Sequence, residues 1–209
     1  MQAAIRGMLL GAALVATLTG CGGGEEATTG KPSDAPTASG RATKEKPFIS
    51  LSAAQVRSAL PADYTLGDAL VGDAPITVKG QEARQNCTES SGASCDGLVA
   101  GGKKELGAEG STDEGHIEFT LYSFDSPQAA STVRKSLAAT ARASVTAPEQ
   151  VEIVSGADET EAFKGTSTTH VVMRLGSVVA HVRAVDTTTG NVHHVATHQI
   201  DLIKDASAK

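Results

Sequence analysis

The feature that most restricts the fold of this chain is a stretch near its N-terminus without large apolar residues. Between Gly22 and Pro47 there is no Val, Ile, Leu, Met, Phe or Tyr. Such a segment cannot bury enough apolar surface to offset the entropy lost on ordering. We therefore expect residues 21–47 to form a disordered tether, of roughly 28 Å root-mean-square span as a flexible coil. Residues 48–209 are then the candidate folded domain.

The residues before the tether have the pattern of a processing signal. Arg6 is the only charged side chain before an apolar segment at residues 8–18, and the sequence Leu-Thr-Gly-Cys ends at Cys21. The apolar segment has the length of a secretory h-region and is too short to span a membrane comfortably. The alternative, a buried N-terminal helix, is disfavoured because the tether cannot pack against it.

The sequence Leu-Thr-Gly-Cys resembles a bacterial lipobox. The resemblance implies that residues 1–20 are a lipoprotein signal peptide and that Cys21 becomes the acylated N-terminus, with palmitate-type chains. One acyl chain anchors a protein only marginally, whereas two or more anchor it durably. We therefore expect a lipid anchor on the extracytoplasmic face of the cell membrane.

The charge of the chain narrows its partners. Its 209 residues carry a formal net charge of −6, which provides no basic surface for nucleic acid. After residue 18, no stretch reaches the roughly 18 apolar residues of a membrane-spanning helix. We therefore expect no nucleic-acid partner, and membrane contact through Cys21 alone.

Helix signals occur at the start, middle and end of residues 48–209. Ser52 to Gln55 form a capping box, and Pro61 ends the helix that follows. Ser126-Pro127 combines an N-cap residue with proline at the first helical position. A third helix begins at Asn191. Its apolar stripe consists of Val192, Val195, Ala196, Leu202 and Ile203.

The strand signals predict a largely antiparallel sheet. Strands are expected at residues 75–80, 98–106, 116–124, 151–156 and 159–165, with 98–106 and 116–124 as the two arms of one hairpin. The best hairpin spans 169–185. In that hairpin, Gly176-Ser177 suits a type II′ turn. The turn places Val171 opposite Val182, Met173 opposite Ala180 and Leu175 opposite Val178 on one face. The other face pairs His170 with Arg183, Val172 with His181 and Arg174 with Val179. Because the connections are too short for crossover helices, we expect a single α+β domain with about three helices flanking the sheet.

The cysteine count favours one disulfide. If Cys21 is lipidated, Cys87 and Cys95 remain, eight positions apart. Beyond the membrane, disulfides persist, and we favour a structural bond closing a small polar loop. The alternative, a redox or metal pair, is weaker because the spacing is not Cys-x-x-Cys and no histidine lies between them.

No catalytic motif is found, so the chain is not expected to be an enzyme or to carry a cofactor. The sequence has no GxSxG, SxxK, HExxH, P-loop or GxGxxG pattern. The best metal candidate is His194, His198 and Asp201, which share one face of the last predicted helix and could hold zinc. That face lies opposite the apolar stripe, so an ordinary solvated surface is the competing interpretation.

A second candidate site is the polar face of the 169–185 hairpin. His170, Arg174, His181 and Arg183 lie on this face. Two guanidinium groups could bind an anion or a carboxylate, and the histidines could make binding depend on pH. The competing interpretation is a solvated face, or one covered by a helix.

Several segments in order resemble one bacterial family. They are "LPADYT", the pair Cys87 and Cys95, "FTLYSFDSPQAAS", "GADETEAF" and "VVMRLGSVVAHV". Together they are similar to the extracytoplasmic sensor-type domain of high-GC Gram-positive (actinobacterial) bacteria. This domain occurs in small lipoproteins and in receptor serine/threonine kinases of the PknH type. The resemblance implies an antiparallel sheet flanked by helices, with a cleft proposed to hold a ligand. The chain departs from the kinases in having no kinase domain, no transmembrane helix and only one possible disulfide.

Three hypotheses follow. The first is a lipid-anchored, sensor-like domain of the cell envelope that binds a small ligand or an envelope protein. The second is a zinc-binding lipoprotein using the last helix. The third is a structural interaction module without a small ligand. A concave pocket favours the first, and a large exposed apolar patch favours the third.

Overall fold

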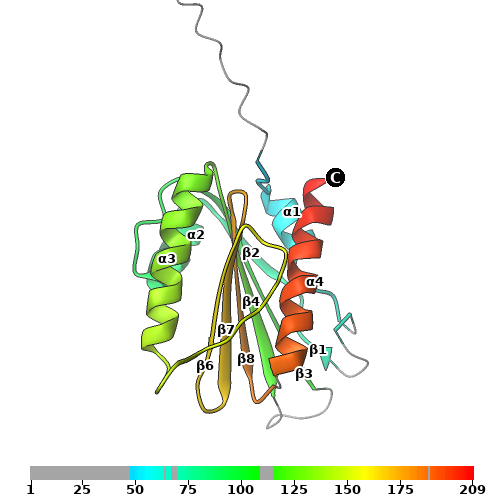
Figure 1. Ribbon diagram of the computed structural model, residues 1–209. Coiled ribbons are helices and arrows are strands. Elements are labelled where there is room, and N and C mark those ends of the chain that lie inside the picture. The colour runs from blue at the N-terminus through cyan, green and yellow to red at the C-terminus, as the bar shows by residue number, and fades with distance from the viewer. Residues whose placement is uncertain (1–47, 64, 67–69, 109–114, 188) are drawn as a thin grey trace, which may run out of the picture. The chain divides into compact units, whose positions relative to one another are not determined.

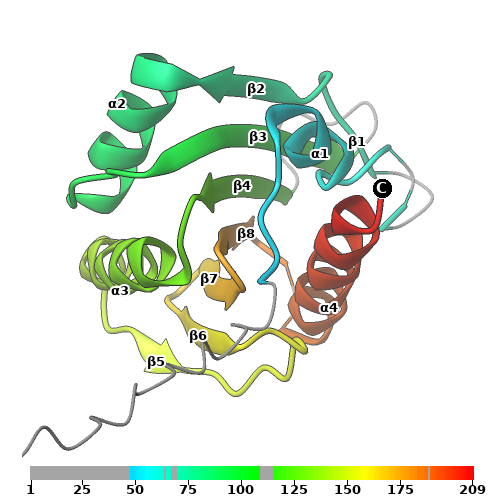
Figure 2. The same cartoon turned by 90° about the horizontal axis from the view of Figure 1, so that it is seen from above.

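One antiparallel sheet organises the domain, with two helices on each face. The computed structural model describes residues 48–63, 65–66, 70–108, 115–187 and 189–209. The predictions for the signal peptide, Cys21 and the tether concern residues 1–47, which lie outside these ranges. Helices α2 and α3 cover one face of the sheet, and α1 and α4 cover the other (Figures 1 and 2).

The elements follow the order expected for an α+β fold. The helices are α1 (Ala53–Ser58), α2 (Gly80–Ser91), α3 (Pro127–Ala143) and α4 (Thr189–Ser207). The strands are β1 (Leu70–Val71), β2 (Ile76–Lys79), β3 (Leu98–Ala108), β4 (His116–Phe124), β5 (Glu149–Gln150), β6 (Glu159–Lys164), β7 (Thr168–Leu175) and β8 (Val178–Val185). The sheet order is β1-β3-β4-β8-β7-β6-β5, with β2 also paired to β3. Every pair is antiparallel, which confirms the predicted fold class.

Two of the three predicted helix starts are confirmed by their caps, and the third helix, α4, begins at Thr189, two residues before the predicted Asn191. The Ser52 side chain accepts from the backbone N–H of Gln55, whose own side chain accepts from the backbone of Ser52. At α3, the Ser126 side chain accepts from the backbone N–H of Ala129, with Pro127 in the first turn. These bonds satisfy backbone donors that a helix leaves free at its N-terminus.

The β7–β8 hairpin has the predicted register and turn. All six residue pairs expected across it are observed. Of the two central turn residues, only Gly176 has a positive φ, at +61°, as a type II′ turn requires. Gly176 is also needed for space, because a Cβ there would lie 2.6 Å from the backbone nitrogen and oxygen of Ile49. The hairpin tip is held there by a bond from Ser177 N–H to the Ile49 carbonyl.

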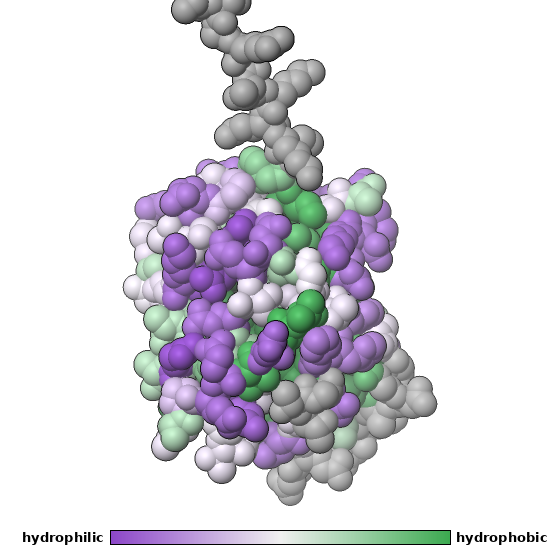
Figure 3. Space-filling view, in the orientation of Figure 1, coloured by the Kyte–Doolittle hydropathy of each residue, from purple (hydrophilic) through white to green (hydrophobic). Residues whose placement is uncertain are grey.

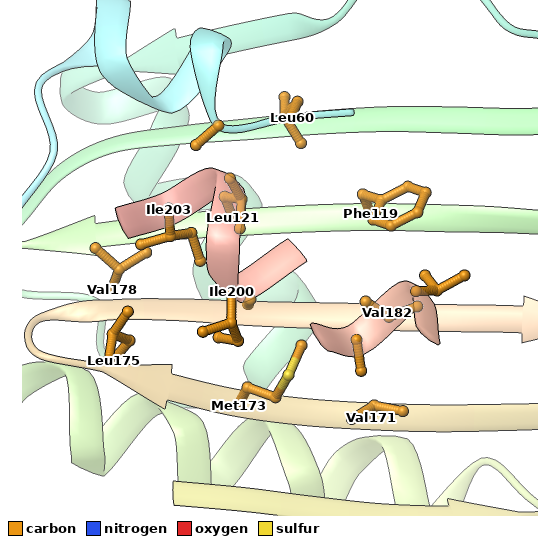
Figure 4. Close-up of a cluster of buried hydrophobic side chains, with 14 of the residues drawn as sticks. Leu60, Phe119, Leu121, Val171, Met173, Leu175, Val178, Val182, Ile200 and Ile203 are labelled. Carbon is orange, nitrogen blue, oxygen red and sulfur yellow. The ribbon is translucent and has the colours of Figure 1, made fainter. Parts of the chain in front are cut away.

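The larger core lies between the sheet and helices α1 and α4. Alternate residues of β4, β7 and β8 point into it, including Phe119, Met173 and Val182, and they meet Ile200 and Ile203 of α4 (Figure 4). A second core lies on the opposite face, where Phe124 and Val179 meet Val133 and Leu137 of α3. The fully buried residues of both cores lie from Leu51 onward, and Ile49 packs against the larger core. Both cores lie within the compact unit Glu45–Lys209, so we expect this unit to fold without the preceding residues.

Three details of the predicted elements were wrong. The described residues contain four helices where about three were expected, because residues 80–91 form α2. The sequence indicated only a polar loop at residues 87–95. Residues 151–156 form no strand, although Val151 N–H donates to the Ala162 carbonyl at the end of β5. In α4, Leu202 is only half-buried, and Ile200 and Ala206 complete the buried stripe.

The disulfide between Cys87 and Cys95 is confirmed. Cys87 is buried in the last turn of α2, and Cys95 lies after the helix, with a Cα–Cα distance of 6.1 Å. The bond therefore fixes the end of α2 to the segment that leads into β3. Among the described residues, no helix combines the length and apolar character needed to cross a bilayer.

Candidate functional site: a pocket between the sheet and helices α2 and α3

A pocket of about 470 Å³ opens between the sheet and the helix pair α2–α3. This volume lies within the range of small-molecule sites. The sheet contributes Ile76, Val78, Gly102, Lys103, Glu118, Thr120, Tyr122, His170, His181 and Arg183, and the helical side contributes Asn86, Glu89, Ser90, Leu137, Thr140, Ala141 and Ser144. Five strands and two helices therefore converge on one hollow.

The helical wall of the pocket is held by bonds between α2 and α3. The side-chain hydroxyls of Ser136 and Thr140 both donate to the backbone carbonyl of Ser91, at 2.8 and 2.9 Å. This carbonyl is at the C-terminus of α2, where the helix itself supplies no donor. Together with the disulfide at Cys87, these bonds fix the end of α2 against α3.

Three charged side chains meet on the sheet side of the pocket. The Glu118 carboxylate of β4 accepts from Arg183 of β8 and lies 3.3 Å from the ammonium of Lys103 on β3. Burial alone raises the pKa of Glu118, but the charges of Lys103 and Arg183 outweigh it and hold the pKa below its usual value. Glu118 is therefore ionised, and two positive charges face one negative charge.

A pair of histidines lies beside these charges. His170 Nδ1 is 3.0 Å from His181 Nε2, and the ring planes are inclined by 15°. Burial, followed by the charge of Arg183, lowers the pKa of His170 to about 4. Burial and the neighbouring His170 lower the pKa of His181 to about 3. Both rings are therefore neutral at pH 7.

A neutral pair has a defined hydrogen-bonding capacity. Two neutral imidazoles have two N–H donors and two lone pairs, and the bond between His170 and His181 uses one of each. The outer nitrogens, His170 Nε2 and His181 Nδ1, are left with one donor and one acceptor. The tautomer decides which ring has which. The pair can therefore offer a ligand either role.

An aromatic stack supports His170 from the far side. The ring of Phe163 on β6 lies 5.3 Å from the His170 ring, and the Arg142 guanidinium of α3 lies 5.1 Å from the Phe163 centroid. Arg142 also pairs with Glu161. These contacts fix the orientation of His170 at the pocket wall.

Of the four residues predicted on the hairpin face, three line the pocket and one lies apart from it. His170, His181 and Arg183 all line the pocket. Arg174 lies on the same face but apart from the pocket, where it pairs with Asp158 and Glu159 and donates to the Gly176 carbonyl. The Nε and Nη1 donors of Arg174 are therefore engaged near the hairpin tip.

The predicted zinc residues do not converge. His194 and His198 have ring centroids 6.4 Å apart on α4, and Asp201 pairs instead with Lys204. Within the part of the chain that the structure describes, no three His, Cys, Asp or Glu side chains lie close enough to share a metal ion. Burial, followed by the charge of His194, lowers the pKa of His198.

The sequence interpretation missed several pocket residues, above all Lys103, Glu118 and Tyr122. The Tyr122 side chain is buried against α2, and burial raises its pKa. Glu118 and Tyr122 share one face of the predicted strand at residues 116–124, because side chains alternate along a strand. The predicted hairpin of 98–106 and 116–124 is confirmed as β3 and β4. What the sequence could not show is that β4 also pairs with β8, which brings Arg183 to Glu118.

Comparisons with known proteins bear on the fold of the chain. No protein-family profile matches the chain, and no curated protein does. Among solved structures, the crystal structure of the extracellular domain of PknH from Mycobacterium tuberculosis superposes with a TM-score of 0.54 at 13% identity. The match covers 76% of this chain and all of that domain. The chain therefore shares its fold with this extracellular domain.

Proposed function

We propose that this protein is a lipid-anchored, extracytoplasmic, sensor-like domain that binds a ligand in the pocket between the sheet and helices α2 and α3. The observation that carries the proposal is the pocket itself. It combines apolar side chains with a small group of convergent polar residues, Glu118, His170, His181 and Arg183. Such a combination is characteristic of binding sites for small molecules.

Two further observations support this proposal. The fold is shared with the extracellular domain of PknH, and the Cys87–Cys95 disulfide suits an oxidising compartment outside the cytoplasm. The anchor is inferred from the lipobox-like residues that end at Cys21. We propose binding rather than catalysis as the activity of the domain.

The alternatives have less support. The zinc hypothesis needs three ligands on α4, and Asp201 is drawn to Lys204 instead. An interaction module would need a large exposed apolar patch. Among the residues that the structure describes, the large exposed apolar side chains are Phe48, Ile76, Val99 and Val154, from four separate segments. On the face shown in Figure 3, hydrophobic residues form only a narrow band within a largely hydrophilic surface. A pocket-based function therefore has the stronger basis.

A pocket-filling variant tests the proposal. The fragment 45–209 would be screened by thermal shift against cell-wall fragments, lipids and small anions, followed by calorimetry on hits. Thr120→Trp places a large side chain in the pocket on a strand that tolerates aromatic residues. Val99→Trp, at an exposed strand position outside the pocket, is the control. We expect Thr120→Trp to abolish binding and Val99→Trp to preserve it. Equal binding by both variants, or no hit of any class, would reject the proposal.

The anchor has a separate test. With Cys21→Ala, the full chain is expected to leave the membrane fraction, because the acceptor of the acyl chains is gone. A Cys21→Ala protein that sediments with membranes as the original does would contradict the lipobox assignment.

A further inference from the structure

We infer that the pocket takes an amphipathic oxyanion, meaning a carboxylate or phosphate monoester joined to an apolar body. This inference rests on the proposed function and adds the chemical class of the ligand. It depends on the charge balance at the sheet side, on unused hydrogen-bond donors, and on the apolar residues of the same hollow.

The charges on the sheet side favour an anion. Lys103 and Arg183 share the carboxylate of Glu118, so these three residues together carry one net positive charge. The histidine pair adds no charge at neutral pH, because burial lowers the pKa values of both rings well below 7. An incoming oxyanion would complete this group as a fourth member, with two cations facing two anions.

Donors are available to hold that oxyanion. A guanidinium group has five N–H donors, and among the described residues Arg183 uses only Nη1, for Glu118. Lys103 has three donors, and its side chain is 53% exposed. The histidine pair supplies one more N–H at an outer nitrogen. Arginine donors in a fixed fork match the planar geometry of carboxylates and phosphates.

A second acidic residue of the lining, besides Glu118, opposes an anion, and its contacts reduce that effect. Glu89 lies on α2, where its side chain is exposed and accepts a hydrogen bond from Gln85 at 2.9 Å. The carboxylate is thus directed along its own helix and solvated. Water and salt screen an exposed charge of this kind more strongly than the half-buried group around Glu118.

The remaining lining requires an apolar body on the ligand. Val78 and Ile76 of β2 and Leu137 and Ala141 of α3 line the same hollow as Arg183. Ile76 is 66% exposed, and a bound hydrocarbon would remove part of this surface from water. Burial of apolar surface is favourable in proportion to its area. A bare ion would leave this half of the pocket unused.

Matched octyl compounds test the inference. Fragment 45–209 would be titrated by calorimetry with octanoate, monooctyl phosphate, 1-octanol, octylammonium and acetate. We expect octanoate or monooctyl phosphate to bind at least tenfold more tightly than 1-octanol, octylammonium or acetate. The tighter of the two oxyanions then distinguishes a carboxylate ligand from a phosphate or lipid-headgroup ligand.

Charge-removing variants give the control. Arg183→Gln and Lys103→Gln should weaken the better oxyanion tenfold or more and change 1-octanol binding less than twofold. Arg57→Gln, on an exposed turn of α1 outside the pocket, should change neither. Because Lys103 is largely exposed, its variant is expected to fold even if Arg183→Gln does not.

Three results would overturn the inference. They are equal binding of 1-octanol and octanoate, unchanged oxyanion binding in both charge variants, and failure of every octyl compound to bind. In each case the proposed function is still tested separately, because the screen with Thr120→Trp and Val99→Trp does not assume a class of ligand. Binding of acetate as tight as octanoate would overturn the apolar half of the inference.

Discussion

The Nδ1 atom of His170 lies 3.0 Å from the Nε2 atom of His181, so two histidines on adjacent strands form one neutral, hydrogen-bonded unit. His170 is only 4% exposed. A proton added to this unit would place a positive charge next to Arg183, in a site with little solvent. Protonation of this histidine pair would therefore change both the charge of the pocket and the stability of the fold.

The first prediction concerns stability against pH. Both histidines have folded-state pKa values, about 4 and about 3, below the usual 6.5. The unfolded state thus binds protons first, and their contribution to stability is complete above about pH 6.5 and falls as the pH decreases. Between about pH 7.5 and about pH 4.5, each histidine should reduce the free energy of unfolding by about 2–3 kcal/mol.

Urea denaturation of the fragment 45–209 at a series of pH values measures this effect. Carboxylates also titrate in this range, so the informative quantity is the difference from the double variant His170→Asn/His181→Asn. We expect the double variant to lose less stability on acidification than the original fragment. Identical pH dependence in the two proteins would show that folding does not lower the pKa values of the two histidines.

The second prediction concerns the neighbours that set the imidazole pKa values. After burial, the charge of Arg183 lowers the pKa of His170, whereas Glu118 raises it. Arg183→Gln should therefore raise the pKa of His170, and Glu118→Gln should lower it further. Imidazole resonances followed by NMR during acid titration give the result, with Arg57→Gln as the control. Shifts in the same direction for both variants would contradict the arrangement of charges.

The third prediction concerns the disulfide. Opening the small loop between Cys87 and Cys95 should lower the free energy of unfolding by roughly 2–3 kcal/mol on the chain-entropy model. Because Cys87 is in the last turn of α2, amide exchange in residues 80–91 should accelerate more than in α4. Hydrogen exchange of the Cys87→Ala/Cys95→Ala variant measures both effects. Unchanged protection of α2 would mean that Ser136 and Thr140 hold the helix without the disulfide.

The fourth prediction concerns the hairpin tip. Gly176→Ala meets both an unfavourable φ and the Ile49 backbone, whereas Gly92→Ala at φ +72° meets only the Thr140 hydroxyl at 3.6 Å. The control should cost about 1–2 kcal/mol for the left-handed conformation alone, and Gly176→Ala should cost more. Thermal unfolding compares the two variants. An equal loss would show that the contact with Ile49 is readily displaced.

The sequence predicted most of the fold because its strongest signals were local. The 169–185 hairpin combines strict alternation with a glycine at the one turn position that needs positive φ, so its register follows directly. The Ser126-Pro127 start was equally clear, because both residues act on the same turn of helix. Such features depend on a few neighbouring residues and need no knowledge of the tertiary structure.

Helix α2 was missed because its helical signals are weak. Only Ala83, Cys87 and Ser91 are buried, four positions apart, and two of the three are small or polar. Lys79 at the N-cap makes no side-chain bond to the helix. The clearest local sign is Gly92, which ends the helix in the left-handed conformation. Tertiary contacts with α3, together with the disulfide, stabilise this helix.

The pocket was predicted only in part. The hairpin provided His170, His181 and Arg183 because they share one face within a local motif. The β3–β4 hairpin was also predicted, but Lys103 and Glu118 join the hairpin residues only because β4 pairs with β8. That pairing is a contact between distant parts of the chain. For the same reason, the sequence did not show that Arg174 lies apart from the pocket. Its partners there, Asp158 and Glu159, belong to another segment of the chain.

The most direct test of the account is to locate a bound ligand on the fragment 45–209. With the best compound from the screen, NMR chemical-shift mapping should show the largest changes at Thr120, Tyr122, Leu137 and His181, which line the pocket. Residues of α4 on the other face, such as His194, should be unaffected. Changes confined to α1 and α4, with none at the four pocket residues, would contradict the claim that ligand binds between the sheet and helices α2 and α3.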